Sequence, residues 1–316
     1  MVFSRYKPKL DQVNGLLNSS LEGEPEKLYK AARHLIRAGG KRVRPLMCIL
    51  SSDAVGGALN DVLATACAVE FIHSFTLIHD DIMDDDFLRR GRKSVHAAYG
   101  VNTAILAGDL LYSKAFELCD GKVAHLLAKA SAMVCEGQEM DMSFEEGLDV
   151  SQEEYLVMIE KKTAALLEVS CRAGAYLGGA SKNQMQGLSD YGLNIGMAFQ
   201  IKDDLLEITG DDEKLGKPSG SDIAEGKKNL LAVRALKCVD GSKKKRLTEL
   251  LAKEDNTFGE IDEVKKIFEE VGAVDYCKTK MNEYYQKSVD SLDILDDSKA
   301  KNHLLEIADF ITSREF

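Results

Sequence analysis

The chain of 316 residues contains no tryptophan and only four prolines, and aromatic residues make up only 7% of it. The prolines fall at positions 8, 25, 45 and 218, where helices are expected to begin or loops to run. Leu, Ala, Glu, Lys and Met are frequent instead, as in helical proteins. Apolar residues recur at helical spacing, and no alternating strand pattern of useful length is present. The sequence therefore predicts an all-α protein.

Acidic residues outnumber basic ones, 52 Asp and Glu against 41 Lys and Arg, so the formal net charge is −11 at pH 7. This balance argues against nucleic acid as a partner. It also disfavours an anionic substrate, unless bound divalent cations reverse the local charge. An acidic pocket that holds Mg²⁺ is a phosphate-binding site, so a phosphorylated substrate is compatible with the composition.

The seven cysteines are odd in number and form no CxxC pair. Most have apolar neighbours, which indicates small core residues in a reducing cytosol rather than disulfides or metal ligands. Neither a signal peptide nor an apolar run of about 18 residues is evident. We therefore expect a cytoplasmic protein without a membrane span.

The periodicity predicts helices at about residues 8–19, 25–37, 45–56, 60–88, 94–119, 122–142, 151–178, 183–209, 227–238, 243–253, 259–271, 273–292 and 298–313. No stretch resembles a flexible linker, so residues 1–316 are expected to form a single all-helical domain. One long irregular segment runs from Thr209 to Gly226 and contains four glycines and a proline. A polar loop of this length within a helical bundle is more often a functional lid than a passive connector.

Two acidic runs carry the strongest chemical signal, one from Asp80 to Asp84 and one from Asp203 to Glu207. In each, two adjacent acids are followed, after two apolar residues, by a third. Positions i and i+4 of a helix lie one above the other, so each run presents stacked carboxylates on one face. Oxygen ligands select hard cations, and Mg²⁺ in particular keeps waters and takes substrate phosphates as ligands. The runs therefore predict a helical enzyme that binds a diphosphate through Mg²⁺.

Cationic residues stand beside these runs. Arg89 and Arg90 follow the first run and can clamp phosphate oxygens, although adjacent arginines on a loop are usually solvated surface. The segment from Gly39 to Pro45 places Lys41 and Arg44 at an expected helix start, where the helix dipole favours an anion. This segment predicts a second diphosphate site built from cations rather than metal.

Three further groups of residues can be interpreted either as ordinary core or surface residues or as part of a binding site. His73 continues the helical stripe of the first acidic run, but a lone histidine is commonly a core residue. Lys162 and Thr163 lie on an expected helix. Lys217 lies within the irregular segment, and Lys227 follows its last residue. Single lysines are normally solvated, yet lysines on a lid after an acidic run are placed to neutralise a metal-bound diphosphate.

Together, GGKRVRP at residues 39–45, HDD…RRG and the FQIKDD run resemble the trans-isoprenyl diphosphate synthases, and most closely the archaeal-type geranylgeranyl diphosphate synthases. The resemblance covers about residues 39 to 230, with the motifs in the expected order. It implies the isoprenoid synthase fold, a single large helical bundle around a central cavity. It further implies head-to-tail condensation of isopentenyl diphosphate with an allylic diphosphate, three Mg²⁺ ions per active site, and a homodimer.

The resemblance also implies roles for individual residues. Asp80, Asp81 and Asp84 match the first aspartate-rich motif, and Asp203, Asp204 and Glu207 match the second, both as Mg²⁺ ligands. Contacts to the allylic diphosphate are implied for Arg89, Lys162, Thr163, Gln200, Lys217 and Lys227. The site for isopentenyl diphosphate is implied for Lys41, Arg44, His73 and Arg90.

Two positions depart from the family pattern. Glu207 stands where a third aspartate is usual, and its extra methylene can move the carboxylate. Asn229 replaces a hydroxyl residue, which leaves open whether Lys227 or Lys228 contacts the diphosphate.

The mechanism implied is heterolysis of the allylic C–O bond, with Mg²⁺ and cationic side chains stabilising the charge that develops on the diphosphate. The alkene of isopentenyl diphosphate then attacks the allylic cation, and loss of a proton gives a product five carbons longer. No side-chain nucleophile is needed, and a closed lid excludes water.

Product length is predicted from the helix that carries the first run. Phe75 and Thr76 stand about one turn before Asp80, and Ile72 stands about one turn further back. The resemblance implies that these residues form the floor of the tail channel, whereas a lone Phe is otherwise ordinary core. We expect a C20 product, with C15 or a C15/C20 mixture as the alternative.

Other functions fit less well. A terpene cyclase needs no second diphosphate site, so Lys41, Arg44, Asp203 and Asp204 argue against it. A squalene-type synthase is not expected to carry GGKRVRP. A non-catalytic synthase subunit loses its acidic motifs, and an acidic helical scaffold leaves the neighbouring arginines unexplained.

Overall fold

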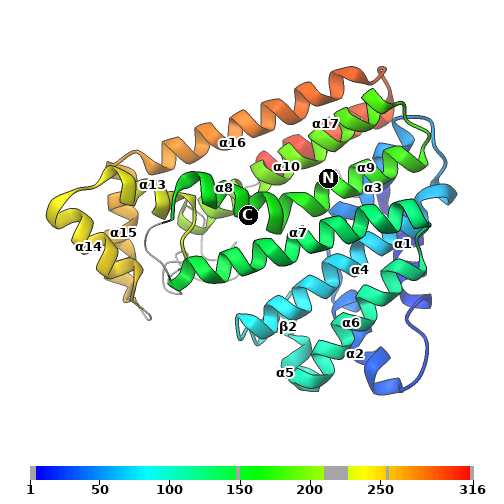
Figure 1. The fold of residues 1–316 in the computed structure, drawn as a ribbon, viewed down its shortest axis with the longest axis horizontal. Coiled ribbons are helices and arrows are strands. Elements are labelled where there is room, and N and C mark those ends of the chain that lie inside the picture. Colours follow the sequence, from blue (N-terminus) through cyan, green and yellow to red (C-terminus); the bar gives the residue numbers. More distant parts are fainter. Residues whose placement is uncertain (1–4, 147–149, 210–226, 254–255, 314–316) are drawn as a thin grey trace. The chain divides into compact units, whose positions relative to one another are not determined.

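The computed structural model describes residues 5–146, 150–209, 227–253 and 256–313 (Figure 1). It is 81% helical, and the described residues contain only one short strand pair. The predicted all-α class is therefore confirmed. The irregular segment 210–226, and with it Lys217, lies outside the described residues.

Backbone contacts group the chain into two compact units, each built from separate stretches of sequence. Unit 1 comprises residues 1–131, 166–189 and 294–304, and unit 2 comprises residues 132–165, 190–293 and 305–316. The expectation of a single domain stays a prediction.

The elements that lie within unit 1 are α1 (Lys7–Ser19), α2 (Glu26–Arg37), α3 (Val43–Asp53), α4 (Leu59–Met83), β1 (Leu88–Arg89), β2 (Arg92–Lys93), α5 (Val95–Tyr99) and α6 (Val101–Glu117). Those of unit 2 are α8 (Gln152–Ile159), the π-helical turn η2 (Glu160–Ala164), α13 (Leu230–Cys238), α14 (Gly241–Leu251), α15 (Phe258–Glu270) and α16 (Ala273–Asp290). Residues of both units occur in α7 (Gly121–Glu146), α9 (Ala165–Leu177), α10 (Lys182–Thr209), the 3₁₀ turn η3 (Ser291–Ile294) and α17 (Lys299–Thr312).

Helix α4 is the core helix of unit 1 and packs against α1, α3 and α6. It is apolar nearly all round, as expected for a helix surrounded by others. By length and composition it also passes as a membrane span, which corrects the expectation that no such apolar run exists. However, 61% of its most apolar window is buried inside the structure, as in the core helix of a soluble protein.

The predicted helix 60–88 ends earlier, at Met83, and this boundary was wrong. Asp85 has a φ of 52°, which a continuing α-helix does not allow. The chain then forms a hairpin in which Leu88 pairs with Lys93, and its two turn residues, Arg90 and Gly91, have φ of 54° and 71°. Positive φ at both positions is typical of the type I′ turn that matches strand twist. The hairpin therefore fixes the direction of the arginines that follow the acidic run.

Two other predicted helices are interrupted. The helix expected at 94–119 breaks at Gly100, whose φ of 85° favours glycine, and becomes α5 and α6. The helix expected at 151–178 begins at a capping box between Ser151 and Glu154, as its sequence allows, but it contains the turn η2. Periodicity alone does not reveal a π turn, because its neighbours keep their helical spacing.

A buried ion pair joins the helices of unit 1. Arg42 donates to the Glu70 carboxylate at 2.5 Å, and both side chains are only 3% exposed. Its other nitrogens donate to the Asn14 side chain at 3.0 Å and to the Ile36 carbonyl at 2.7 Å. One guanidinium therefore contacts residues of α1, α2 and α4 from the start of α3. Burial of both charges requires this full set of partners.

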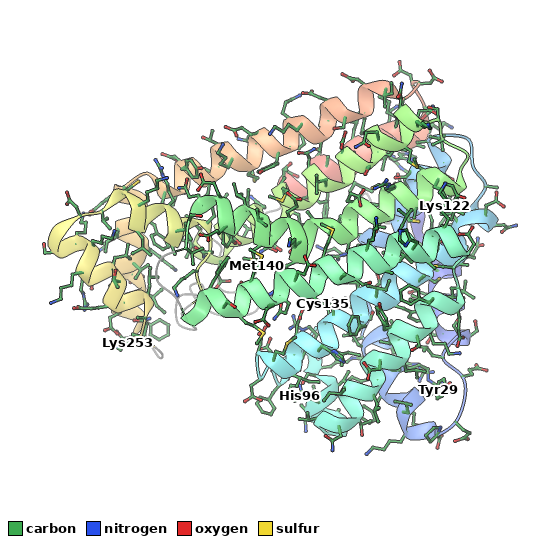
Figure 2. All side chains as sticks on the ribbon, in the orientation of Figure 1. Tyr29, His96, Lys122, Cys135, Met140 and Lys253 are labelled. Carbon is green, nitrogen blue, oxygen red and sulfur yellow. The ribbon has the colours of Figure 1, made fainter. Side chains whose placement is uncertain are left out.

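All seven cysteines are free thiols, as expected. Cys48, Cys67, Cys171 and Cys277 are buried, and Cys135 is exposed on α7 (Figure 2). Burial raises the pKa of Cys171 to about 12, so this thiol stays protonated and behaves as a small apolar residue.

Replacing Glu70 with alanine leaves the buried Arg42 charge without its carboxylate. We expect the free energy of unfolding of Glu70→Ala to fall by about 3–5 kcal/mol, measured by urea denaturation. Asp11→Ala is the control, because it breaks an exposed Lys7–Asp11 pair and is expected to cost less than about 1 kcal/mol. Equal losses in the two variants would contradict the assigned role of the buried pair.

Candidate active site

The first acidic run lies at the C-terminal end of α4. The Asp84 N–H donates to the Asp80 carbonyl at 2.8 Å, so the last turn keeps the i, i+4 stacking that the sequence predicts. Asp80 is half-buried and Asp84 is exposed, whereas Asp81 is fully buried. The run therefore divides into two carboxylates that solvent reaches and one that it does not.

Asp81 is held by the hairpin arginine. The Arg89 Nε donates to Asp81 Oδ1 at 2.6 Å, and Arg89 also pairs with Asp86 at 3.1 Å. The other oxygen, Asp81 Oδ2, is buried and accepts no hydrogen bond from the described residues. Burial raises the pKa of Asp81, and Arg89 counteracts the shift. A buried carboxylate oxygen that lacks a donor is a suitable partner for a cation.

The basic loop between α2 and α3 adjoins the hairpin. Arg90 donates to the Gly39 carbonyl, and its guanidinium lies so close to Gly40 that a Cβ there would be 2.8 Å from the guanidinium nitrogen. Glycine at this position therefore allows the close approach. Lys41 is exposed on the same loop.

His73 of α4 faces Arg44, which lies in the first turn of α3 directly after this loop. The Arg44 guanidinium lies 3.2 Å from His73 Nε2. Burial lowers the pKa of His73 well below its ordinary value, and the positive charges of Arg44 and Arg90 lower it further. His73 is therefore neutral and accepts from Arg44. The structure thus brings together Arg44, His73 and Arg90, three of the four residues predicted to bind isopentenyl diphosphate.

The predicted channel floor belongs to an aromatic cluster in unit 1. The Phe75 ring lies 4.8 Å from His79 and 5.2 Å from Tyr112 of α6, between ring centroids, and Tyr112 contacts Phe116 in turn. The Thr76 hydroxyl donates to the His73 carbonyl within α4. Ile72 is fully buried. Of the three residues predicted to form the floor, Phe75 is partly accessible, and its ring faces Tyr112 of α6.

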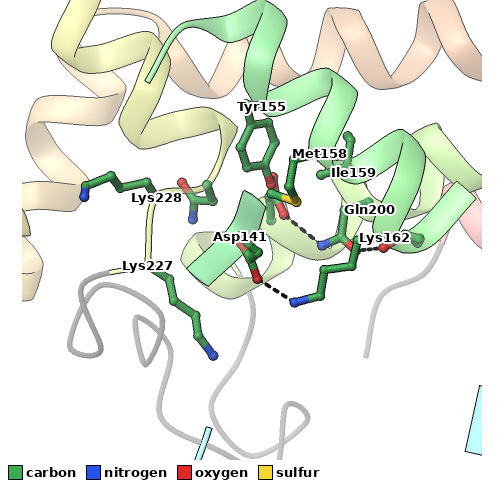
Figure 3. Close-up of a pocket in the computed structure, with 11 residues that line it drawn as sticks. Asp141, Tyr155, Met158, Ile159, Lys162, Gln200, Lys227 and Lys228 are labelled. Atoms are coloured by element: carbon green, nitrogen blue, oxygen red, sulfur yellow. Dashed lines mark hydrogen bonds and ion pairs between the residues drawn. The ribbon is translucent and has the colours of Figure 1, made fainter. Parts of the chain in front are cut away.

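Unit 2 contains a cavity of about 180 Å³ (Figure 3). It is lined by Asp141, Tyr155, Met158, Ile159, Lys162, Thr163, Gln200, Asp204, Lys227, Lys228 and Asn229. The sequence assigned five of these residues to a diphosphate or metal site, and the fold collects them in one place.

Asp204 is the centre of the hydrogen bonds around this cavity, although it is only 4% exposed. The Tyr155 hydroxyl donates to Asp204 Oδ2 at 2.6 Å, and the Leu230 N–H donates to the same oxygen at 3.3 Å. The Gln200 amide donates to Oδ1 at 3.1 Å and its carbonyl accepts from the Thr163 hydroxyl at 2.8 Å. Asp203, the preceding acid, is half-buried, whereas Glu207 is as buried as Asp204.

The turn η2 presents Lys162 to the cavity. The Lys162 ammonium pairs with Asp141 of α7 at 2.5 Å. One turn before Asp141, Gly137 lies against the backbone of η2. A Cβ at Gly137 would be 2.4 Å from the backbone nitrogen of Lys162. The π turn and the glycine together bring the lysine backbone onto α7, and π turns are frequent at functional sites.

The two lysines before α13 differ in direction. Lys228 is buried, and its ammonium donates to the Phe144 carbonyl at 2.5 Å. Figure 3 shows Lys228 extending away from Lys162 and Asp141, while Lys227 extends toward their side. The geometry therefore favours Lys227 for a ligand contact.

Among the described residues, no group of three or more His, Cys, Asp and Glu side chains is arranged to hold a metal ion. This fits Mg²⁺, which needs only one or two protein carboxylates when phosphate oxygens and waters complete its octahedron. Asp80, Asp84 and Asp203 are the accessible carboxylates of the two runs, and Asp81 Oδ2 lacks a donor. The residues present thus suit Mg²⁺ that arrives with a diphosphate.

A second cavity, of about 540 Å³, lies in unit 1 among Tyr6, Lys9, Asp53, Lys299 and other residues at the starts of α1 and α17. Its single carboxylate, Asp53, pairs with Lys9. None of the predicted site residues lines it.

Residues 25–271 match the family described as polyprenyl synthetase. The chain belongs to this family. This polyprenyl synthetase is 47% identical, over 92% of its length and 91% of the relative, to the short chain isoprenyl diphosphate synthase of Methanothermobacter thermautotrophicus. It is 40% identical to the geranylfarnesyl diphosphate synthase of Natronomonas pharaonis, over 93% and 92% of the two chains.

Its structure resembles the crystal structure of geranylgeranyl pyrophosphate synthetase from Pyrococcus horikoshii with a TM-score of 0.95. The two chains are 40% identical, and 99% of this chain and 98% of that one are covered. The isoprenoid synthase fold and the prenyltransferase class predicted from the sequence are thereby confirmed, and so is head-to-tail chain elongation as the reaction. Enzymes of this family generally depend on Mg²⁺.

Several residues of this polyprenyl synthetase were not predicted from the sequence. Asp141 and Tyr155 contact the predicted Lys162 and Asp204, and Glu70 holds Arg42 of the basic loop. A lone acid or tyrosine on a helix carries no signal of its own. Their functional neighbours come from other parts of the chain, so only the fold reveals them.

The state of His73 predicts a pH dependence of stability. Its pKa is lowered in the folded protein, so below about pH 6.5 the unfolded chain binds a proton that the folded chain does not. The free energy of unfolding should therefore fall as the pH drops from about 7.5 to 5.5, with His73 contributing at most about 1.4 kcal/mol. His73→Gln, which keeps an acceptor for Arg44 but does not titrate, should show a smaller fall in urea denaturation. An identical pH dependence in both proteins would contradict a neutral His73.

Proposed function

We propose that this prenyltransferase condenses isopentenyl diphosphate with dimethylallyl, geranyl or farnesyl diphosphate and that its main product is geranylgeranyl diphosphate (C20). The observation that carries the proposal is the cavity of unit 2, where Lys162, Lys227 and Gln200 converge beside the second acidic run. Two cations and an amide are donors for phosphate oxygens, and the accessible carboxylate of Asp203 in the same run suits Mg²⁺.

The Mg²⁺ ions, three per active site as predicted, are assigned to Asp80 and Asp84 of the first run and to Asp203 of the second. When bound, Mg²⁺ supplies positive charge to the diphosphate oxygens. Asp81 and Asp204 are the buried carboxylates of the two runs, and Arg89 and Tyr155 hold them in place. Asp81 Oδ2, which accepts no hydrogen bond from the described residues, still suits contact with a cation. Glu207 is buried, which favours a role in the packing around the run over direct ligation.

The cationic side chains stabilise the leaving diphosphate. As the allylic C–O bond breaks, its electron pair moves onto the diphosphate oxygen, where Lys162, Lys227 and Arg89 are assigned as donors. In the described structure Lys162 and Arg89 pair with Asp141 and Asp81. A substrate diphosphate would replace Asp141 and Asp81 as the partner of these two cations. The cations are therefore already positioned before the substrate binds. Lys217 is assigned to the same substrate and lies outside the described residues.

Isopentenyl diphosphate is assigned to the cluster of Lys41, Arg44, His73 and Arg90. Neutral His73 adds no charge of its own, and it orients Arg44 by accepting its hydrogen bond. This cluster contains no carboxylate among its four members, which supports recognition of a diphosphate without metal. The alkene attacks the allylic cation, and the proton lost from the adduct passes to the departing diphosphate.

We also propose a homodimer in the cytoplasm. Val101, Ile105 and Leu106 of α6 are apolar and exposed, although the opposite face of that helix, with Ala104, Ala107, Gly108, Leu111 and Ala115, is buried. An apolar row on one helix is an interface when a second copy covers it.

Removal of an accessible carboxylate should abolish turnover. Purified protein is given labelled isopentenyl diphosphate and an allylic primer, with and without Mg²⁺. We expect Mg²⁺-dependent elongation that stops at C20, and at least a hundredfold loss of kcat, on the order expected for a lost electrostatic group, in Asp80→Asn and Asp203→Asn. Asp275→Asn, at an exposed acid of α16, should elongate as the wild type does.

Elongation at the wild-type rate by Asp203→Asn would contradict the metal assignment. Failure of the folded wild type to elongate any primer would contradict the proposed reaction, and release of a cyclised hydrocarbon instead would identify a terpene cyclase.

Product length tests the aromatic cluster. Phe75→Ala removes the ring that contacts His79 and Tyr112, so we expect products longer than C20 on chromatographic analysis. Phe258→Ala, at a ring that is 80% exposed on α15, should leave the distribution unchanged. A distribution in Phe75→Ala that matches the wild type would place the channel floor at another residue.

A further inference from the structure

We propose that Tyr155 is a positioning residue, whose hydroxyl fixes Asp204 and through it the second acidic run and the start of α13. This inference rests on the proposed function, because it concerns the residues assigned there to Mg²⁺ and the allylic diphosphate. Tyr155 does not contact the substrate in this assignment; it acts through Asp204.

The contact is short and shielded. Tyr155 is 3% exposed and Asp204 is 4% exposed, and the hydroxyl donates to Asp204 Oδ2 at 2.6 Å. Hydrogen bonds to an ionised acceptor are shorter and stronger than neutral ones, and at this distance the bond belongs to that class. Because both side chains are buried, a water molecule cannot easily replace the hydroxyl as a donor to Asp204.

Asp204 connects three helices through its donors. Tyr155 comes from α8, Gln200 from the preceding turn of α10, and the Leu230 N–H from the first residue of α13. The N–H at a helix start has no partner within its own helix, and a carboxylate there also suits the helix dipole. Tyr155 and Leu230 share one oxygen, so the hydroxyl holds the carboxylate in the orientation that caps α13.

Through this arrangement, the positions of Lys162 and Lys227 depend on the Asp204 carboxylate. Lys227 lies three residues before Leu230, the first residue of α13. The position of the helix start therefore limits where the Lys227 side chain can lie. Lys162 and Thr163 follow Tyr155 on the continuous stretch of α8 and η2, and Thr163 donates to the same Gln200 that donates to Asp204. Asp203 directly precedes Asp204 on α10, so fixing Asp204 also limits where the accessible Asp203 carboxylate can lie.

Tyrosine at position 155 therefore has two separable parts. The ring fills the space beside Met158 and Ile159, and phenylalanine would fill it equally. Only the hydroxyl reaches Asp204. Tyr155→Phe thus removes the proposed function of the residue while keeping its packing, so it separates positioning from a purely structural role.

The test compares Tyr155→Phe with Tyr276→Phe. Tyr276 is a matched control in unit 2, because its hydroxyl donates to Gln152 at 3.2 Å and does not contact Asp204. Isothermal titration calorimetry measures binding of an unreactive dimethylallyl thiolodiphosphate with and without Mg²⁺. Circular dichroism and thermal unfolding report the fold, and kcat and KM are measured for each substrate.

We expect Tyr155→Phe to weaken Mg²⁺-dependent binding of the analogue about tenfold, as for loss of one hydrogen bond to a charged group. The KM for the allylic substrate should rise, and the KM for isopentenyl diphosphate should change less than twofold. Tyr276→Phe should match the wild type in both. Unchanged binding in Tyr155→Phe, whether or not its thermal stability falls, would overturn the proposal.

A double variant makes the test independent of how well Tyr155→Phe folds. Asp204→Asn removes the carboxylate that the hydroxyl serves, so adding Tyr155→Phe to it should weaken binding by less than about twofold. A full tenfold further loss would mean that Tyr155 acts by another route. Because calorimetry needs no turnover, a wild type that binds the analogue but fails to elongate would refute the proposed reaction and leave the positioning role intact.

Discussion

The ion pair of Arg42 and Glu70 organises unit 1. A guanidinium withdrawn from water requires a carboxylate and further acceptors, and here these come from Asn14, Ile36 and Glu70 on three helices. Arg42 has a left-handed backbone with φ of 51°. The chain therefore turns at this residue, and Lys41, the residue before it, stays exposed.

Asp204 is the corresponding buried carboxylate of unit 2, and it accepts hydrogen bonds from three neutral donors. Tyr155, Gln200 and the Leu230 N–H surround it, and all three reach the carboxylate only when α8, α10 and α13 are packed. In both units a buried charge fixes elements that are distant in sequence. Accessible charges beside it then remain for ligands, which need groups that are held in position but not screened by water.

Much of this could be predicted from the sequence, for a physical reason. Helix periodicity depends on local spacing, so the elements and the all-α class follow from it, and the i, i+4 stack of Asp80 and Asp84 persists even though α4 ends at Met83. The hairpin after α4 and the π turn before α9 were missed. Backbone turns with positive φ and single π turns depend on which neighbours pack against them, and periodicity does not record this.

The sequence by itself determined which chemistry the chain carries: two acidic runs, a basic glycine loop and a set of lysines in the order typical of polyprenyl synthetases. Only the tertiary structure decided how the members of each set differ in burial and contacts. Asp81 and Asp204 are buried and hydrogen-bonded while Asp80, Asp84 and Asp203 stay accessible, the Lys228 ammonium donates to the Phe144 carbonyl, and Tyr155 contacts Asp204. Adjacent residues of one type cannot be told apart from the sequence pattern. Burial distinguishes them, because loss of solvation changes the free energy of a charged side chain more than its secondary-structure propensity does.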